Sequence, residues 1–479
     1  MKQTVGTLTK EKANGRIYTP DFIVANILDL CDYSGSGILK KHIIDNSCGD
    51  GAFLTEIVCR YCSAAQTLGL PPEELSRELS EFIHGIEIDR AECEKCIANL
   101  SKAANAFGVN DVSWDIRCAD ALTVTGYAGK MDFVVGNPPY VRVHNLLENY
   151  DAVKQYSFSR NGMTDLFIVF YEIGLNMLNS TGVLGYISPS SLFNSIAGAA
   201  MRGYLNRNHN IKKVVDLKHY QPFDATAYTA ILILTKEYNS FVDYYEYDSI
   251  KKVPFAVSRL SYEDFNMSNS YIFGEKSTLT ELKRIMSYTG GSCAYTVKNG
   301  FATLCDEFFI GDWDFTEYTI PIVKASTGRM AKCLFPYDKH GKLLPFEVLS
   351  NVPGIRRHYE TYAGKLKTRS IDKSGAWYGF GRTQGINDVG KKKYAINTLI
   401  RDVKDIKLRL CEPGTGVYSG LYILTEVSCD DLKKILFTDE FISYIAMLGK
   451  YKSGGYYTYS SKDLSRYLNY KFFEGAITR

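Results

Sequence analysis

The fold is decided by the stretch Ile43-Ile-Asp-Asn-Ser-Cys-Gly-Asp-Gly-Ala-Phe-Leu54, in which an apolar run ends in an acidic residue and then turns into a helical pattern. Gly49 and Gly51 permit a tight turn and let a ligand approach the backbone closely. The stretch lacks the Gly-Lys-Ser/Thr of a phosphate-binding loop and does not match Gly-x-Gly-x-x-Gly. Asp45, at the end of the predicted strand, suits a cationic group such as the amino group of an amino acid. A purely structural turn is the alternative.

Strand-like apolar runs recur on both sides of this turn. They lie at residues 42–45, 82–88, 112–118, 133–135, 183–187, 214–217 and 230–234. Helical periods separate most of them, as at 53–68, 90–106 and 166–177. This alternation predicts an α/β fold with a doubly wound, parallel, Rossmann-like sheet of seven strands, which would bind its ligand at the carboxyl ends of the strands.

The composition is that of an ordinary globular protein. The chain has 479 residues, of which 45% are hydrophobic and 23% charged. No apolar run approaches the roughly 18 residues of a membrane span, and the first residues lack the apolar core of a signal peptide. The 12 Cys of so long a chain demand no disulfide framework. We therefore expect a cytoplasmic protein without a membrane partner.

Two cysteine pairs, Cys59-x-x-Cys62 and Cys93-x-x-Cys96, have the spacing of zinc ligands. Both lie on predicted helices and lack the glycine-rich knuckle that usually presents thiolates. Buried small residues are the competing interpretation, and it is the one we adopt. No metal is predicted.

Two further carboxylates end predicted strands. Glu87 in Gly85-Ile-Glu-Ile-Asp89 is placed to accept hydrogen bonds from both hydroxyls of a ribose. Asp120 in Cys118-Ala-Asp-Ala-Leu122 can accept from an exocyclic amine. Each alone could be a solvated strand end, but together with Asp45 they form a set suited to a nucleoside that carries an amino acid.

The segment Met131-Asp-Phe-Val-Val-Gly-Asn-Pro-Pro-Tyr140 places Asn-Pro-Pro-Tyr directly after a buried strand. The prolines fix φ and remove two backbone donors, which leaves carbonyl groups to accept hydrogen bonds. The side-chain carbonyl of Asn137 and the backbone carbonyl of Pro138 suit an amino group attached to an aromatic ring. Tyr140 offers a face on which that ring can stack. A rigid loop without further role is the alternative.

The second half of the chain has a different character. From about Tyr244 onward the strand–helix alternation disappears. Between Ser350 and Arg409 there are 14 Lys and Arg against 5 Asp and Glu, a local charge of +9, whereas the whole chain carries +3 and the remainder therefore −6. A basic segment in an otherwise acidic protein is typical of a surface that binds a polyanion. A solvated charged face is the alternative.

The order of these motifs resembles the gamma-class DNA adenine-N6 methyltransferases of restriction–modification systems. The resemblance covers about half of the chain, from Gly15-Arg-Ile-Tyr-Thr-Pro20 to Gly182-Val-Leu-Gly-Tyr-Ile-Ser-Pro189. The rest is similar only loosely, at Gly379-Phe-Gly-Arg-Thr-Gln-Gly385 and Ser453-Gly-Gly-Tyr-Tyr-Thr458. The resemblance implies an S-adenosylmethionine-dependent catalytic domain over residues 1–245, followed by a mixed α+β DNA target-recognition domain over residues 246–479.

The resemblance also implies roles for single residues. Asp45 would bind the amino group of S-adenosylmethionine, Glu87 its ribose and Asp120 its adenine amine. The complete cofactor set would be Thr19, Asp45, Ser47, Gly49, Glu87, Ile88, Asp120, Ala121, Leu122 and Asn137. Asn137, Pro138 and Tyr140 would hold the flipped adenine, with Phe223 as the second stacking residue and Tyr228 as its alternative. Many family members carry Glu in place of Asp45, so a longer or water-mediated contact is expected here.

Double-stranded DNA is the implied partner, and the implied location is the bacterial cytoplasm at the nucleoid, with the chain acting as a monomer. The residues expected to contact phosphates are Arg356, Arg357, Lys365, Lys367, Arg369, Lys391, Lys392 and Lys393. The glycine-rich loop at 377–386 would present Arg382 and Gln384 to base edges, and a structural turn is the alternative. Because only 14 residues precede Gly15, any restriction endonuclease is expected to be separately encoded.

Other functions remain open at this point. Cytosine-N4 methylation uses a similar tetrapeptide that typically carries Ser in place of Asn137. Methylation of an RNA guanine or a protein glutamine uses the same tetrapeptide, but such enzymes need no long basic C-terminal half. A catalytically silent DNA-binding specificity subunit is a non-enzymatic alternative, and the intact motif together with the three carboxylates argues against it.

Overall fold

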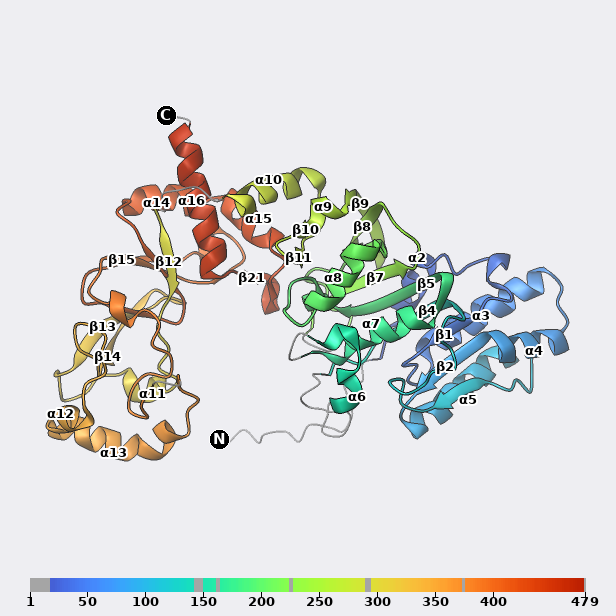
Figure 1. The fold of residues 1–479 in the computed structure, drawn as a ribbon, viewed down its shortest axis with the longest axis horizontal. Helices are drawn as coiled ribbons and strands as arrows, with labels where there is room; N and C mark the ends of the chain where they lie inside the picture. Colours follow the sequence, from blue (N-terminus) through green and yellow to red (C-terminus); the bar gives the residue numbers. More distant parts are fainter. Residues whose placement is uncertain are drawn as a thin grey trace. The chain divides into compact units, whose positions relative to one another are not determined.

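The computed structural model describes residues 18–141, 150–160, 164–223, 227–288, 294–372 and 375–477. It divides into two compact units, Met1–Thr280 and Glu281–Arg479 (Figure 1). The structural boundary therefore lies after residue 280 and not after residue 245 as predicted, because β8 (Phe241–Asp248) and β9 (Val253–Ser261) extend the sheet of the first unit. Within the described residues, no helix combines the length and the apolar character that crossing a membrane requires.

The first unit is built on a nine-stranded sheet with the order β3-β2-β1-β4-β5-β7-β6-β8-β9. The strands before β8 are β1 (Ile43–Asp45), β2 (Ile83–Glu87), β3 (Asp115–Cys118), β4 (Met131–Gly136), β5 (Leu178–Pro189), β6 (Ile211–Asp216) and β7 (Thr229–Thr235). Each predicted strand overlaps one of these, so the α/β class is confirmed. Two details of the prediction are wrong, because the sheet has nine strands and because β7 runs antiparallel to both β5 and β6.

The helices follow the strands closely in sequence. Those of the first unit are α2 (Asp21–Leu30), α3 (Ala52–Thr67), α4 (Pro72–Phe82), α5 (Arg90–Asn105), α6 (Tyr150–Lys154), α7 (Leu166–Met177), α8 (Ala199–Asn208) and α9 (Tyr262–Phe265), followed by α10 (Lys276–Ser287), which crosses the boundary. Gly51 starts α3 with a φ of +94°, a conformation that favours glycine. Asp89 caps α5 by accepting hydrogen bonds from the backbone N–H groups of Ala91 and Glu92.

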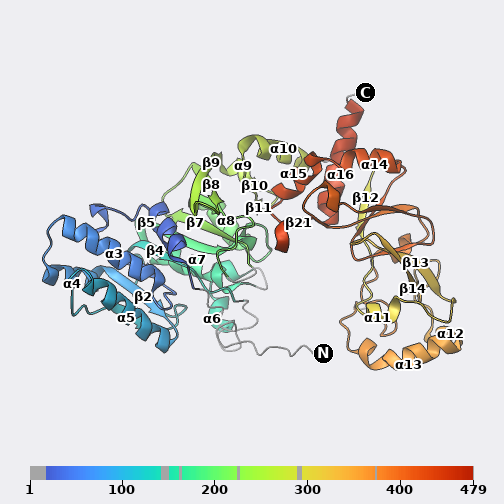
Figure 2. The same cartoon turned by 180° about the vertical axis from the view of Figure 1, so that it is seen from behind.

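Helices cover both faces of the sheet, as β5 demonstrates. A Cβ added at Gly174 in α7 would lie 2.5 Å from Leu184 and 2.8 Å from the hydroxyl of Tyr186. A Cβ added at Gly185 would instead lie 3.1 Å from Ile27 in α2. Alternate residues of a strand point to opposite faces, so α7 and α2 lie on opposite sides of β5 (Figure 2).

Strands β1 to β5 are all parallel to one another in the sheet. Their carboxyl ends therefore meet at one edge, which we call the carboxyl edge. The segments that follow these strands, at 46–51, 88–90, 119–122, 137–141 and 190–198, all start from it. This arrangement is what places the predicted site residues near one another.

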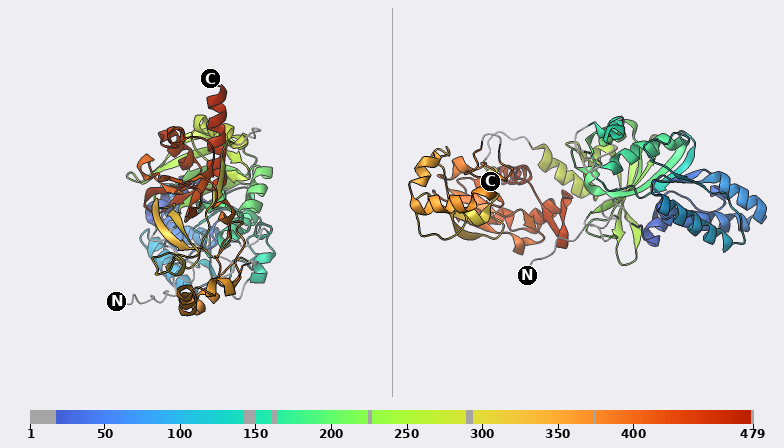
Figure 3. Two further views of the ribbon diagram at one scale, coloured as in Figure 1. Left: turned by 90° about the vertical axis from the view of Figure 1, so that its left-hand side faces the viewer. Right: turned by 90° about the horizontal axis from the view of Figure 1, so that it is seen from below.

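The second unit is mixed α+β, as predicted (Figure 3). Its sheets have the orders β12-β19-β15-β17, β14-β13-β18 and β16-β21-β20. The strands are β12 (Thr296–Asn299), β13 (Thr319–Lys324), β14 (Arg329–Leu334), β15 (Lys393–Ile396), β16 (Leu399–Ile400), β17 (Leu408–Cys411), β18 (Gly416–Tyr418), β19 (Leu421–Leu424), β20 (Tyr451–Lys452) and β21 (Tyr456–Thr458). The helices are α11 (Asp306–Phe309), α12 (Phe346–Ser350), α13 (Pro353–Lys367), α14 (Cys429–Leu436), α15 (Asp439–Met447) and α16 (Ser461–Ile477). The short pair β10 (Asn266–Met267) and β11 (Ser270–Tyr271) belongs to the first unit.

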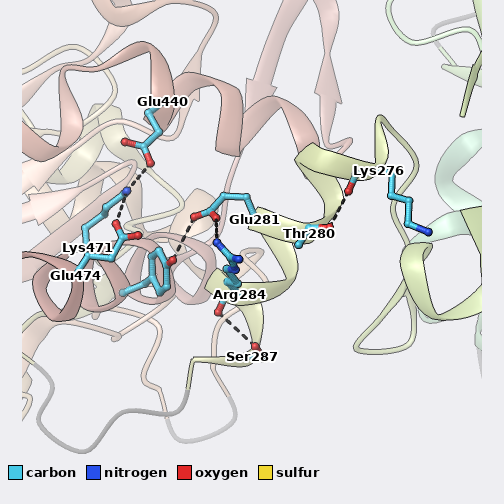
Figure 4. A network of polar contacts seen from close by, with 9 residues as sticks. Lys276, Thr280, Glu281, Arg284, Ser287, Glu440, Lys471 and Glu474 are labelled. Atoms are coloured by element: carbon cyan, nitrogen blue, oxygen red, sulfur yellow. Dashed lines mark hydrogen bonds and ion pairs between the residues drawn. The ribbon is translucent and has the colours of Figure 1, made fainter. Parts of the chain in front are cut away.

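Polar contacts fix the end of α10 within the second unit (Figure 4). Glu281 accepts a hydrogen bond of 3.2 Å from the hydroxyl of Tyr470 in α16 and pairs with Arg284 at 3.3 Å. Lys471, also in α16, pairs with Glu474 at 2.6 Å and with Glu440 of α15. Because these contacts join α10, α15 and α16, the first and last segments of this unit are held together.

Candidate functional site

Three carboxylates stand at the carboxyl edge: Asp45 and Glu87 are the last residues of β1 and β2, and Asp120 follows β3. Asp45 is buried at 2% exposure and accepts a hydrogen bond of 3.0 Å from the backbone N–H of Ser47. Glu87 accepts from the backbone N–H groups of Gly49 at 3.0 Å and Asp89 at 2.9 Å. The structure thus brings Glu87 against the glycine turn that follows β1. Asp120 shapes its own turn by accepting from the N–H of Leu122 at 2.9 Å.

The environment of Asp45 favours a positively charged ligand. Burial raises the pKa of Asp45 to about 7, the Ser47 N–H opposes this shift, and the negative charge of Glu87 adds to it. An ammonium group placed beside the carboxylate would restore its ionised form. The hydroxyl of Ser47 is buried and has no hydrogen-bond partner among the described residues. Both observations fit the amino-acid end of S-adenosylmethionine.

The apolar residues expected around the cofactor's adenine lie next to these carboxylates. Ile88 is 64% exposed at the end of β2, whereas Ala121 and Leu122 are buried. The backbone carbonyl of Leu122 accepts a hydrogen bond of 2.7 Å from Tyr156. The contact of these residues with an adenine ring stays a prediction.

Strand β4 ends at Gly136, a residue that the sequence analysis did not single out. Its φ is +152°, and a Cβ added there would lie only 2.6 Å from a carboxylate oxygen of Asp45. Glycine is therefore required for the loop after β4 to pass beside the buried carboxylate. The Gly-Asn-Pro-Pro order was the available signal, since only glycine tolerates so close an approach.

Thr19 and Asn137 are brought together although 118 residues separate them. The side-chain N–H of Asn137 donates to the hydroxyl oxygen of Thr19 at 3.1 Å, and Thr19 is buried. This bond orients the amide of Asn137 so that its carbonyl oxygen is the acceptor end. Thr19, predicted as a cofactor residue, therefore also positions the amide expected to hold the target amine.

Tyr140 lies in an aromatic environment at the same edge. Its ring centroid is 6.2 Å from that of Phe167 and 6.5 Å from that of Phe223, with interplanar angles of 72° and 80°. Its hydroxyl donates to the backbone carbonyl of Ile187 at 3.4 Å. Phe223 is thus near Tyr140, but the two rings stand edge to face and do not form the parallel pair that would sandwich a base. Residues 224–226, which follow Phe223, lie outside the described residues.

The cysteine pairs occupy helix interiors. Cys62 and Cys96 belong to the hydrophobic core of the first unit. Burial raises the pKa of Cys62 and of Cys93 to about 12, as expected of thiols that pack among apolar groups. These facts support the interpretation as buried small residues.

Most of the predicted phosphate contacts lie on the surface of the second unit. Exposed side chains belong to Arg356, Arg357, Lys365, Lys367, Lys391, Lys392 and Gln384. Helix α13 carries the first four, and Lys365 also forms an ion pair with Glu307. Lys391 pairs with Asp388 at 2.8 Å. These residues are positioned to meet a polyanion, and that role stays a prediction.

Two of the predicted contacts are wrong, because their side chains bind backbone carbonyls inside the unit. Lys393 is 1% exposed, and its ammonium donates to the carbonyls of Asp388, Val389 and Lys391 at 2.7, 3.3 and 2.9 Å. Arg369 donates to the carbonyls of Thr303, Leu366, Trp377 and Gly379. Burial lowers the pKa of Lys393 to about 8. Both residues hold loops in place.

Arg382 is partly engaged in the same way. Its guanidinium donates to the carbonyls of Ser370 at 3.0 Å and Gly381 at 2.9 Å, and it lies 3.5 Å from a carboxylate oxygen of Asp372. Its backbone pairs with that of Ala302. The glycine-rich loop therefore has a structural function, and its contact with base edges stays a prediction. Gln384 in this loop is exposed.

The lysines at 392 and 393 provide a matched test of this assignment. We expect Lys393→Ala to lower the free energy of unfolding by about 1–3 kcal/mol, because three carbonyls lose their donor. Lys392→Ala removes an exposed side chain and should change it by less than about 0.5 kcal/mol, while weakening the binding of DNA. Urea unfolding and a DNA titration at two salt concentrations measure both effects. Equal destabilisation by the two variants would contradict the assignment.

Asn46 is a second residue that the sequence analysis missed. It is buried beside Asp45, accepts a hydrogen bond of 2.8 Å from the hydroxyl of Tyr186, and directs its own N–H toward the sulfur of Met177. Tyr186 lies in β5, so this contact ties the glycine turn to the interior of the sheet. No local pattern identifies it, because the two partners are 140 residues apart.

Comparison with known proteins shows what the first unit is similar to. Residues 60–223 match the Eco57I restriction-modification methylase family. The chain is 27% identical over 420 residues to the type II methyltransferase M.BstVI of Geobacillus stearothermophilus, covering 76% of this chain and 73% of that protein. It is 31% identical over 240 residues to the type II methyltransferase M.PaeR7I of Pseudomonas aeruginosa, covering 47% of this chain and 41% of that protein.

The fold is also found in solved structures. The type IIL restriction-modification enzyme MmeI in complex with DNA aligns with 92% of this chain and 63% of its own, with a TM-score of 0.61 at 15% identity. The ATP-dependent type ISP restriction-modification enzyme LlaBIII bound to DNA aligns with 88% of this chain and 35% of its own, with a TM-score of 0.51 at 11% identity. At these identities the likeness concerns the fold alone. The sequence match goes further for residues 60–223, which are similar to the Eco57I restriction-modification methylase family.

Proposed function

We propose that this chain transfers a methyl group from S-adenosylmethionine to the N6 amino group of an adenine that has been flipped out of double-stranded DNA. The contact between Gly136 and the carboxylate of Asp45 carries the proposal. It brings the expected acceptor for the cofactor's amino group beside the Asn-Pro-Pro-Tyr loop. Donor and target would then meet at the carboxyl edge between β1 and β4.

Each of the three carboxylates would bind a different group of S-adenosylmethionine. Asp45 would pair with the ammonium group, Glu87 would accept from the ribose hydroxyls, and Asp120 would accept from the adenine amine of the cofactor. When bound, S-adenosylmethionine supplies a methyl group on a sulfonium centre that reacts with nitrogen nucleophiles. The buried position of Asp45 keeps water from competing for its carboxylate.

Asn137 and Pro138 would activate the target. The exocyclic nitrogen of adenine is a poor nucleophile, because its lone pair is delocalised into the ring. Accepting hydrogen bonds from both of its N–H groups favours a pyramidal nitrogen whose lone pair points at the methyl group. These contacts strengthen as positive charge develops on the nitrogen, so they stabilise the transition state more than the ground state. The proton leaves after the transfer, and no strongly basic side chain is needed.

Double-stranded DNA is the proposed partner, with Tyr140 stacking on the flipped base and the basic surface of the second unit contacting phosphates. The DNA complexes of structural neighbours support this view. We place the protein in a bacterial restriction–modification or solitary methylation system. Asn137, where cytosine-N4 enzymes typically carry Ser, favours adenine as the target.

The test supplies labelled S-adenosylmethionine with plasmid DNA, RNA and a protein extract, followed by methylation-aware sequencing of the DNA. The proposal expects label in DNA at adenines of one recurring sequence. Label at cytosine N4 would correct the target base. Label in RNA or protein, or none in any of the three, would overturn the proposed function.

A further inference from the structure

Ile196 is an apolar side chain presented to water at the carboxyl edge. It is 81% exposed. It lies in the turn between the short helix Ser190–Phe193, which follows β5, and α8. Strand β5 is parallel to β4, which leads into Asn137 and Tyr140. Because parallel strands end at the same edge, Ile196 and the Asn-Pro-Pro-Tyr loop start from neighbouring strand ends.

Strand β5 and the short helix that lead into the Ile196 turn contact the candidate site and the segment before β7. The hydroxyl of Tyr140 donates to the carbonyl of Ile187, near the end of β5. The backbone N–H of Ser190 donates to the carbonyl of Tyr228 at 2.8 Å, which fixes the start of the turn to the segment before β7. The same segment approaches Tyr140 through Phe223. The end of β5 and the loops after β4 and β6 therefore meet around Tyr140.

The turn is also rigidly supported from inside. Arg202 of α8 is buried, and its guanidinium donates to the carbonyls of Leu192 at 2.5 Å, Ser195 at 2.9 Å and Asn269 at 2.7 Å. A Cβ added at Gly198 would lie 2.5 Å from the carbonyl of Leu192, so the turn is closed as tightly as glycine allows. Burying a guanidinium costs free energy unless its N–H donors are hydrogen-bonded. Here these donors bind the carbonyls of Leu192 and Ser195, at the two ends of the segment before Ile196.

Arg202 thus fixes a turn that leaves the side chain of Ile196 exposed to water, so this side chain contributes no hydrophobic stabilisation to the fold. We propose that Ile196 is a wedge that enters the base stack of the DNA when the target base leaves it. Apolar side chains that insert between base steps unstack and hold open a duplex. A rigid support is needed, because the wedge must displace stacked bases. The inference rests on the proposed function and assigns to Ile196 the opening of the duplex next to Tyr140.

The test uses oligonucleotide duplexes that contain the methylated sequence. In one duplex the target base is paired, and in the other it faces an abasic position, so that it is already unpaired. We expect Ile196→Ala to slow methylation of the paired duplex by about 10- to 100-fold, and to leave the rate on the abasic duplex close to that of the wild type. Ile196→Leu should restore most of the rate on the paired duplex.

Leu68→Ala is the matched control, because Leu68 is 59% exposed and follows the end of α3, away from the carboxyl edge. It should leave both rates unchanged. Equal slowing of both duplexes by Ile196→Ala, or no slowing of either, would overturn the wedge while the proposed function stands. Absence of methyl transfer to DNA by the wild-type protein would instead overturn the proposed function, and the wedge with it.

Discussion

Asn137→Ala should reduce the rate of methyl transfer by about 100- to 1,000-fold or more, the scale of removing one preorganised hydrogen-bonding group from a transition state. The proposed acceptor is the side-chain carbonyl oxygen, whose orientation is set by the bond from the Asn137 amide to Thr19. Without it, the target nitrogen would keep its lone pair in the ring. Single-turnover methylation at saturating cofactor and DNA measures the effect on the chemical step.

The affinity for S-adenosylmethionine distinguishes this role from a general disturbance of the site. We expect Asn137→Ala to change that affinity by less than about threefold, since the contacts assigned to the cofactor come mainly from other residues. Asn137→Asp is the conservative control. It keeps an oxygen at the acceptor position, and the Thr19 hydroxyl can donate to it, so it should retain more activity than alanine. Near-normal turnover by Asn137→Ala would show that another group accepts from the target amine.

The sequence predicted the positions of the strands and of the carboxylates because both leave a local signal. A buried strand is a short apolar run, and Asp45, Glu87 and Asp120 each stand directly where such a run ends. Parallel pairing then brings the three turns to one edge without further information. The prediction of a parallel sheet missed the antiparallel direction of β7, although the sequence before β7 indicates it. Residues 217–228 lack a helical period, and a parallel connection needs a crossover.

Other features depend on the direction in which a side chain points in the folded chain. The run Lys391-Lys-Lys393 looks uniformly solvated, yet Lys393 points inward to three carbonyls while Lys392 stays exposed. Lys393 is buried whereas Lys392 is exposed, because Lys393 is the first residue of β15 and all residues of that strand are buried. Arg369 is similar, because its acceptors come from three separate segments. Charge counting finds a basic segment, but only the tertiary structure tells which charges reach the surface.

Asp45→Asn should stabilise the ligand-free protein at neutral pH while it weakens cofactor binding. Burial raises the pKa of the Asp45 carboxyl to about 7, above the value near 4 expected in the unfolded chain. A carboxyl with a raised pKa binds more protons in the folded state than in the unfolded state. Its contribution to stability is therefore intact below about pH 4, is lost progressively as the pH rises to about 7, and stays lost above it.

At pH 8 the ionised, buried carboxylate costs about 4 kcal/mol, from about three pKa units at 1.36 kcal/mol each. The amide oxygen introduced by the substitution can still accept from the Ser47 N–H, but it carries no charge to desolvate. We therefore expect Asp45→Asn to raise the free energy of unfolding by about 2–4 kcal/mol at pH 8 and by little near pH 4. Urea unfolding of the ligand-free protein across this pH range measures the difference.

The same substitution should weaken S-adenosylmethionine binding by about 10-fold or more, because the ammonium group loses its charged partner. Titration calorimetry at pH 8 measures this affinity. Asp111→Asn is the matched control, since Asp111 is exposed and its φ of +57° is one that asparagine adopts readily. It should alter neither stability nor affinity. A gain in stability together with unchanged affinity would show that Asp45 is a costly buried carboxylate but does not bind the cofactor. Unchanged stability with lost affinity would mean that another charge already neutralises the carboxylate before the cofactor binds.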